Sequence, residues 1–192
     1  MRKTVLLFAS IALASLLVSG VALSSTSITC PNSGSVGCKG TDGNDTMIGT
    51  AKGDMMEGFA GDDQMYGQPG TDGVSGGVGK DELFGGGGTD YVEGGAGSDV
   101  IRAGRNGSGL HGLQEILLGG SGSDEVYGSE GRDLIYAGRG TDAIEGGEGA
   151  DDIRAEGDKQ RDEIDCGAGK DRVTFDAGVD RVSSNCEVRE PR

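Results

Sequence analysis

The 192-residue sequence contains no tryptophan, one histidine, three prolines and only eight phenylalanine and tyrosine residues. So few aromatic side chains cannot fill a conventional globular core. The formal net charge of −15 argues against nucleic acid or an anionic membrane as a partner, because both need a basic protein surface. With His111 as the one imidazole, histidine-based zinc sites and a Ser-His-Asp triad are poorly supported.

The N-terminal segment, 1–24, is predicted to be a secretory signal peptide. Arg2 and Lys3 precede an uncharged apolar run from Val5 to Val18, and small residues follow up to Ser24. This order of a basic, an apolar and a small-residue segment is typical of such signals. The apolar run is short for a membrane span, so a retained anchor is the less favoured alternative. Cleavage after Ser24 would deliver the protein to an extracellular setting, where disulfides persist.

Glycine and acid are abundant, and they recur with a period of nine. Residues 40–183 divide into thirteen nine-residue units, such as GGVGKDELF and GGEGADDIR, and two irregular stretches at 103–118 and 155–165. The fourth position is glycine in every regular unit except one, where Lys52 stands. The sixth position is always an acid: Asp45, Asp54, Asp63, Asp72, Asp81, Asp90, Asp99, Glu115, Asp124, Asp133, Asp142, Asp151, Asp162, Asp171 and Asp180.

The eighth position of each unit is always apolar: Met47, Met56, Met65, Val74, Leu83, Val92, Ile101, Leu117, Val126, Ile135, Ile144, Ile153, Ile164, Val173 and Val182. A short fixed period is the mark of a solenoid, in which each unit buries its apolar face against its neighbours. Nine residues suit a glycine-rich turn of about six and a strand of about three, whose middle side chain points inward. The expected fold is all-β: a flattened parallel β-roll of two sheets, with two units, or about 18 residues, in each coil.

Stacking of coils would align the acids in two columns. We expect one edge to carry Asp45, Asp63, Asp81, Asp99, Glu115, Asp133, Asp151 and Asp171. The other edge would carry Asp54, Asp72, Asp90, Asp124, Asp142, Asp162 and Asp180, with a gap where residues 103–109 offer no acid. Like charges about 4.8 Å apart repel by about 0.8 kcal/mol even in water. Twelve such pairs cost about 10 kcal/mol, comparable with the stability of a whole domain. A shared divalent cation would remove this repulsion, and calcium suits carboxylates mixed with carbonyls.

The pattern resembles the hemolysin-type calcium-binding repeat, the RTX nonapeptide G-G-x-G-x-D-x-U-x, over residues 40–183. GGVGKDELF, GGAGSDVIR, GGSGSDEVY and GGEGADDIR are among the units that match it at every defined position. The resemblance implies a parallel β-roll with multiple Ca²⁺ ions between consecutive turns. It also implies that the sixth-position acids are calcium ligands, together with turn carbonyls. Weakened or missing sites are expected at Lys52 and in residues 103–118.

Four cysteines lie toward the two ends of the chain's repeat region, where Cys166 opens a repeat, and they allow three disulfide connectivities. Cys186 follows Cys166 by one coil plus two positions, so we favour a bond between them and a second bond between Cys30 and Cys38. The predicted organisation is a signal peptide (1–24), an N-terminal cap (25–39), the roll (40–183) and a C-terminal cap and tail (184–192).

The function expected from this pattern is that of a secreted, non-enzymatic calcium-binding protein that folds when calcium binds. A calcium-stiffened cell-surface adhesion or matrix protein is the alternative. A hydrolase is the least supported, because its G-x-S-x-G string (Gly73, Ser75, Gly77) would need His111 as base. Calcium ions are the expected partners of a monomer, with no nucleic acid and no membrane span; a protein or glycan partner stays open.

Overall fold

The computed structural model describes residues 25–31, 37–104 and 114–192, and its described residues form strands and no helix. The first sheet contains β1 (Thr26–Thr29), β3 (Asp45–Ile48), β5 (Gln64–Tyr66), β6 (Pro69–Gly70), β8 (Glu82–Gly88), β10 (Val100–Gly104), β12 (Glu125–Tyr127), β15 (Ala143–Glu145), β18 (Glu163–Asp165) and β21 (Arg181–Val182). The second contains β2 (Cys38–Lys39), β4 (Met55–Ala60), β7 (Gly73–Val78), β9 (Tyr91–Ala96), β11 (Ile116–Ser121), β14 (Leu134–Arg139), β17 (Asp152–Ala155), β20 (Arg172–Phe175) and β22 (Val188–Pro191). A small third sheet contains β13 (Glu130–Gly131), β16 (Glu148–Gly149) and β19 (Ala168–Gly169).

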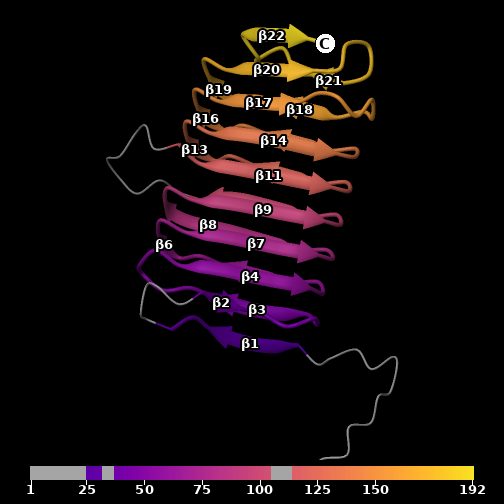
Figure 1. The fold of residues 1–192 in the computed structure, drawn as a ribbon. Helices are drawn as coiled ribbons and strands as arrows, with labels where there is room; N and C mark the ends of the chain where they lie inside the picture. Colours follow the sequence, from indigo (N-terminus) through magenta and orange to yellow (C-terminus); the bar gives the residue numbers. More distant parts are fainter. Residues whose placement is uncertain (1–24, 32–36, 105–113) are drawn as a thin grey trace, which may run out of the picture.

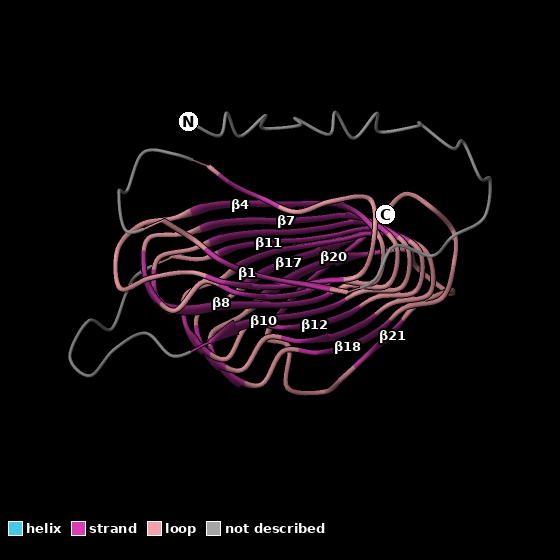
Figure 2. Ribbon diagram, turned by 90° about the horizontal axis from the view of Figure 1, so that it is seen from below, coloured by secondary structure: helices cyan, strands magenta, loops and turns pink. Residues whose placement is uncertain are grey.

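Apart from the short strands β6, β13, β16 and β19, successive strands alternate between the two large sheets. The coils stack along one axis from the N-terminal to the C-terminal end (Figure 1). Seen along that axis, the sheets form two layers joined by loops at both edges (Figure 2). Every pairing between described strands is parallel, and in the regular part Met47 pairs with Met65 and Met65 with Leu83. The predicted parallel β-roll, with a sequence separation of 18 between stacked positions, is therefore confirmed. No helix among the described residues could cross a membrane.

The core is the column of eighth-position side chains between the two layers. Met47, Leu83, Ile135 and Val173 have no exposed surface, and the other members are equally or nearly buried except Val182, which is only partly buried. Side chains on either side of each inward residue point outward, because a strand alternates its faces. A thin stripe of aliphatic residues thus suffices where aromatic residues are scarce.

The expected order of the acid columns is wrong beyond Asp99. Ile101 pairs with Val126, and Asp99 donates its backbone N–H to Asp124, at a sequence separation of 25 rather than 18. Glu115 stacks on Asp90 instead, since Ile116 pairs with Tyr91. β10 in the first sheet is followed along the chain by β11 in the second, so strand alternation and the acid columns continue without a gap. Residues 105–113, including His111, lie outside the described part.

The two disulfides join the favoured pairs, Cys30 with Cys38 and Cys166 with Cys186, each with a Cα–Cα distance of 5.2 Å. All four side chains are buried at the two ends of the core. The bonds therefore hold the first and last coils, where a solenoid has a neighbour on only one side.

Replacing Cys166 and Cys186 together by serine is expected to lower the free energy of unfolding by about 3 kcal/mol, because the bond closes a loop in the unfolded chain and so reduces its conformational entropy. Guanidinium unfolding in saturating calcium would measure the loss. An unchanged unfolding midpoint and slope would contradict a stabilising role for this bond.

The G-x-S-x-G string lies within β7, where Gly73 pairs with Tyr91 and Ser75 with Glu93 of the parallel neighbour. A nucleophile elbow requires a sharp strand-to-helix turn that exposes the serine. Ser75 instead occupies an ordinary strand position in the second sheet, so the local backbone does not support the hydrolase alternative.

Candidate metal sites

The sixth-position acids lie at the end of each turn, directly before a strand or, for Asp45, as its first residue. All are buried except Asp180, which is partly buried. Strand pairing brings them together in two columns, one beside each large sheet. The column before the first sheet contains Asp45, Asp63, Asp81, Asp99, Asp124, Asp142, Asp162 and Asp180. The column before the second sheet contains Asp54, Asp72, Asp90, Glu115, Asp133, Asp151 and Asp171.

One oxygen of most of these carboxylates links adjacent coils. The backbone N–H of Asp63 donates to Oδ1 of Asp81 at 2.9 Å, and the N–H of Asp81 donates to Oδ1 of Asp99 at the same distance. Corresponding bonds of 2.8–3.0 Å run along both columns. These charge-assisted bonds fix where each carboxylate points.

The second oxygen is buried and has no hydrogen-bond partner in most turns. Such an oxygen is present at Asp63, Asp72, Asp81, Asp90, Asp99, Glu115, Asp124, Asp133, Asp142, Asp151 and Asp171. Neither oxygen of Glu115 or Asp133 has a partner. An unpaired buried charge is costly, and native proteins normally pair such groups or coordinate them to a metal.

The first glycine of a unit leaves open the space toward which this oxygen points. A Cβ atom added to Gly94 would lie 2.5 Å from Oδ2 of Asp99 and 2.5 Å from the carbonyl oxygen of Gly119 in the next coil. At Gly85 the corresponding distances are 2.8 Å to Oδ2 of Asp90 and 2.6 Å to the Ala103 carbonyl. Carboxylate and carbonyl oxygens from neighbouring coils thus converge on a cradle that any side chain would fill.

This donor set fits calcium. In the described part of the chain no group of three or more acidic, histidine or cysteine side chains gathers around one point, so each cradle combines few carboxylates with backbone carbonyls. Calcium accepts such mixed oxygen ligands in irregular geometry, whereas structural zinc prefers sulfur and nitrogen. When bound, the ion would supply the positive charge that the unpaired carboxylate oxygens lack.

Burial raises the pKa of most acids in the two columns, because loss of water penalises the ionised form. It raises the pKa of Glu115 to about 9 and that of Asp133 to about 8, with repulsion from the next acid in the column adding to the shift. The pKa of Asp72 and of Asp81 rises to about 7, although a backbone N–H donated to each carboxylate opposes the rise. The metal-free roll therefore favours protonated carboxyls near neutral pH.

Acid is expected to stabilise the metal-free roll and to weaken its calcium binding. Below about pH 4 these acids are protonated in both the folded and the unfolded chain. As pH rises toward the folded-state pKa values of about 6 to 9, only the unfolded chain ionises freely, so the free energy of unfolding of the metal-free roll falls. Metal-stripped protein should show more strand signal in circular dichroism at pH 5 than at pH 8. With calcium the order should reverse, because protons compete for the ligands. A metal-free signal that grows toward pH 8 would contradict this assignment.

Sequence reasoning missed one acid of the column. The N–H of Asp171 donates to Oε2 of Glu187 at 2.9 Å, and the next residue, Val188, pairs with Arg172. Glu187 therefore occupies the sixth-position slot of a last, incomplete unit. It lies less than a full coil beyond Asp171 and in a segment without the repeat pattern, so no periodic signal pointed to it.

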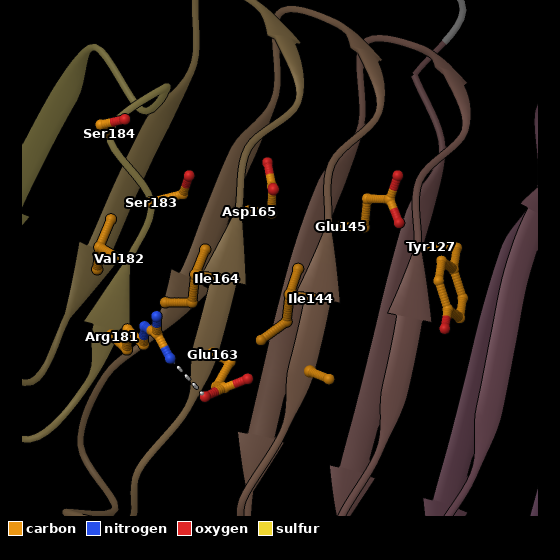
Figure 3. Close-up of a pocket in the computed structure, with 11 residues that line it drawn as sticks. Tyr127, Ile144, Glu145, Glu163, Ile164, Asp165, Arg181, Val182, Ser183 and Ser184 are labelled. Atoms are coloured by element: carbon orange, nitrogen blue, oxygen red, sulfur yellow. Dashed lines mark hydrogen bonds and ion pairs between the residues drawn. The ribbon is translucent and has the colours of Figure 1, made fainter.

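A separate shallow cavity of about 590 Å³ lies over β12, β15, β18 and β21 (Figure 3). Glu163 pairs with Arg181 at 3.5 Å on its surface, and Ser183 and Ser184 also line it. No imidazole stands among its lining residues to act as base for either hydroxyl. The lining of this cavity is thus unlike the turns, where carboxylate and carbonyl oxygens converge.

A family model described as the RTX calcium-binding nonapeptide repeat (4 copies) matches residues 39–74, 70–101, 118–153 and 154–182, more than half of the chain. Neither the search of curated proteins nor that of solved structures returns a match. The matched segments contain all the sixth-position acids except Glu115. Repeat pattern, parallel roll and family match agree, and the chain belongs to the RTX calcium-binding nonapeptide repeat family.

Proposed function

We propose that this chain is an exported, non-enzymatic protein whose repeat domain folds when several calcium ions occupy its turns. The observation that carries the proposal is the set of buried second oxygens, from Asp63 to Asp171, that have no hydrogen-bond partner. In the eight units of this set that begin with glycine, the oxygen is aimed into a cradle that also receives a carbonyl of the next coil, as at Gly94. A bound cation would satisfy both groups.

The fifteen sixth-position acids are the residue set from which the ligands are drawn. Residues 1–24 would be removed on export, residues 25–39 and 184–192 would cap the ends, and residues 40–183 would bind the ions. The two disulfides support an oxidising compartment, because such bonds are rare in cytosolic proteins. Calcium that binds only the folded state stabilises that state at every occupied site. Many weak sites would therefore make folding depend steeply on the calcium concentration.

Calcium titration of the purified chain 25–192 by isothermal calorimetry tests this function. Dissociation constants of about 0.1–1 mM are expected, as for other extracellular modules. Magnesium should bind more weakly, because it dehydrates reluctantly and needs an octahedron. Heat changes absent at millimolar calcium would overturn the proposal.

Export and role are tested separately. N-terminal sequencing of protein recovered from the culture medium should begin at Ser25 if the signal is cleaved as expected. Recovery of the protein with the cell surface rather than the medium would favour the adhesion alternative.

A further inference from the structure

The second residue of each turn adopts one of two backbone conformations. Positive φ values occur at Phe59 (78°), Gln68 (76°) and Ser129 (76°), which is uncommon for residues other than glycine. The other turns with positive φ have glycine there: Gly77, Gly86, Gly95, Gly104, Gly120, Gly138, Gly147 and Gly167. In the four remaining units the second residue, Thr41, Thr50, Glu156 or Asp176, does not have positive φ.

Where the second residue does not have positive φ, it can close the turn by donating a hydrogen bond to the sixth-position acid of the same turn. The N–H and hydroxyl of Thr41 donate to Oδ2 of Asp45 at 2.6 and 3.0 Å. Thr50 makes the same two bonds to Oδ2 of Asp54 at 2.6 and 2.9 Å. The N–H of Asp176 donates to Oδ2 of Asp180 at 2.7 Å. In these turns the oxygen that would face a cation is already satisfied.

With positive φ, the second residue instead joins the contacts between coils. Its carbonyl accepts the N–H of the third residue one coil later, as from Glu148 to Ser129 at 2.7 Å and from Gly87 to Gln68 at 3.0 Å. The acid of the same turn then keeps its second oxygen unpartnered, as at Asp133 and Asp72.

The two features coincide in every unit. All eleven units with positive φ at the second residue have an acid with an unpartnered buried second oxygen: Asp63, Asp72, Asp81, Asp90, Asp99, Glu115, Asp124, Asp133, Asp142, Asp151 and Asp171. In the four other units, those of Asp45, Asp54, Asp162 and Asp180, Oδ2 is not among the unpartnered buried atoms, although Oδ1 of Asp45 is.

We propose that the second residue of each turn decides whether the turn takes calcium, so that eleven turns supply a carboxylate ligand and the three turns closed on Asp45, Asp54 and Asp180 do not. The inference rests on the proposed calcium-binding function. Calcium at Oδ2 of Asp45 or Asp54 would have to displace two hydrogen bonds to that oxygen, whereas at Asp81 it displaces none. The two turns closed by threonine lie in the first coil, beside the Cys30–Cys38 bond, and form a metal-independent cap at that end.

The residue type accounts for the conformation at Thr41 and Thr50. A β-branched threonine strongly disfavours positive φ, whereas glycine adopts it freely. The turn of Thr41 is otherwise a complete repeat, with Gly40, Gly43 and Asp45 in their usual positions. Its sequence thus departs from the repeat pattern at the second residue.

Thr41→Gly is the gain-of-site test. Equilibrium dialysis of chain 25–192 against saturating calcium should show one more bound ion per chain than the wild-type protein. Thr41→Val is the matched control, since it keeps the β-branch and the N–H while losing only the hydroxyl, and its ion count should not change.

Ser129→Thr is the loss-of-site test in an interior turn. The added methyl group disfavours positive φ at residue 129 and should close that turn on Asp133, with a loss of one bound ion. Ser129→Asn, which tolerates positive φ, should keep the wild-type count. If the wild-type chain binds no calcium, the proposed function fails; if it binds calcium but neither Thr41→Gly nor Ser129→Thr changes the count, the role of the second residue is refuted.

Discussion

Removal of calcium is expected to abolish the strand spectrum of this protein at neutral pH. Burial with one oxygen unpartnered raises the pKa of Asp99, for instance, from 3.8 to about 6. A pKa rise of this size means that keeping the carboxylate ionised in the fold costs about 3 kcal/mol. A domain is stable by only about 5–15 kcal/mol, so a few such acids without a cation match the whole stability of the roll.

Far-UV circular dichroism of chain 25–192 at pH 7.5, in excess chelator and then with excess calcium, would measure the effect. We expect an unfolded spectrum in chelator and recovery of the strand minimum as free calcium passes through the millimolar range. Magnesium at the same concentration is the ionic-strength control and should restore less. A strand spectrum that persists in chelator would refute calcium-dependent folding.

Gly149→Ala is expected to disrupt the roll even in saturating calcium. Gly149 has φ of +151° and pairs with Gly131 on one side and Gly169 on the other. An added Cβ atom would overlap the carbonyl oxygen of Gly131 in the preceding coil. Because that obstacle is backbone and not a flexible side chain, the coils would have to separate, at a cost of about 3 kcal/mol or more.

Gly157→Ala is the matched control for the steric effect. Gly157 also has positive φ, +104°, but an added Cβ atom would meet nothing within 4 Å. Its substitution should cost only the strain of a left-handed alanine, about 1–2 kcal/mol. Guanidinium unfolding in saturating calcium would compare the free energies of unfolding of the two variants. Equal losses of stability would show that close packing of coils is not what requires glycine at residue 149.

Much of this fold could be predicted from the sequence because each unit interacts mainly with its neighbours. The spacing of Met47, Met65 and Leu83 already places them in one buried column, and the structure pairs them as expected. The Cys166–Cys186 bond followed from the same coil length. In a solenoid, local periodicity and tertiary contacts are set by the same interval.

The segment of the sequence between β10 and β11 shows where this reasoning fails. Counting residues divided that stretch into two units and moved Glu115 into the column of Asp99, whereas strand pairing places it on Asp90. An insertion changes the count along the chain but does not change which sheet the next strand must join. Alternation of the two layers therefore decides the column.

The sequence by itself determined the period, the buried stripe, the acid at each turn and the calcium-binding family, since all of these are read from residue types at a fixed interval. Only the tertiary structure decided which acids stack on one another, that Glu187 completes a column, and that Asp45 and Asp99 differ in whether Oδ2 is already bonded. The physical reason is that these features depend on hydrogen bonds between coils and on the sign of one backbone dihedral angle. Serine and glycine share that sign at residues 129 and 95, although their side chains differ.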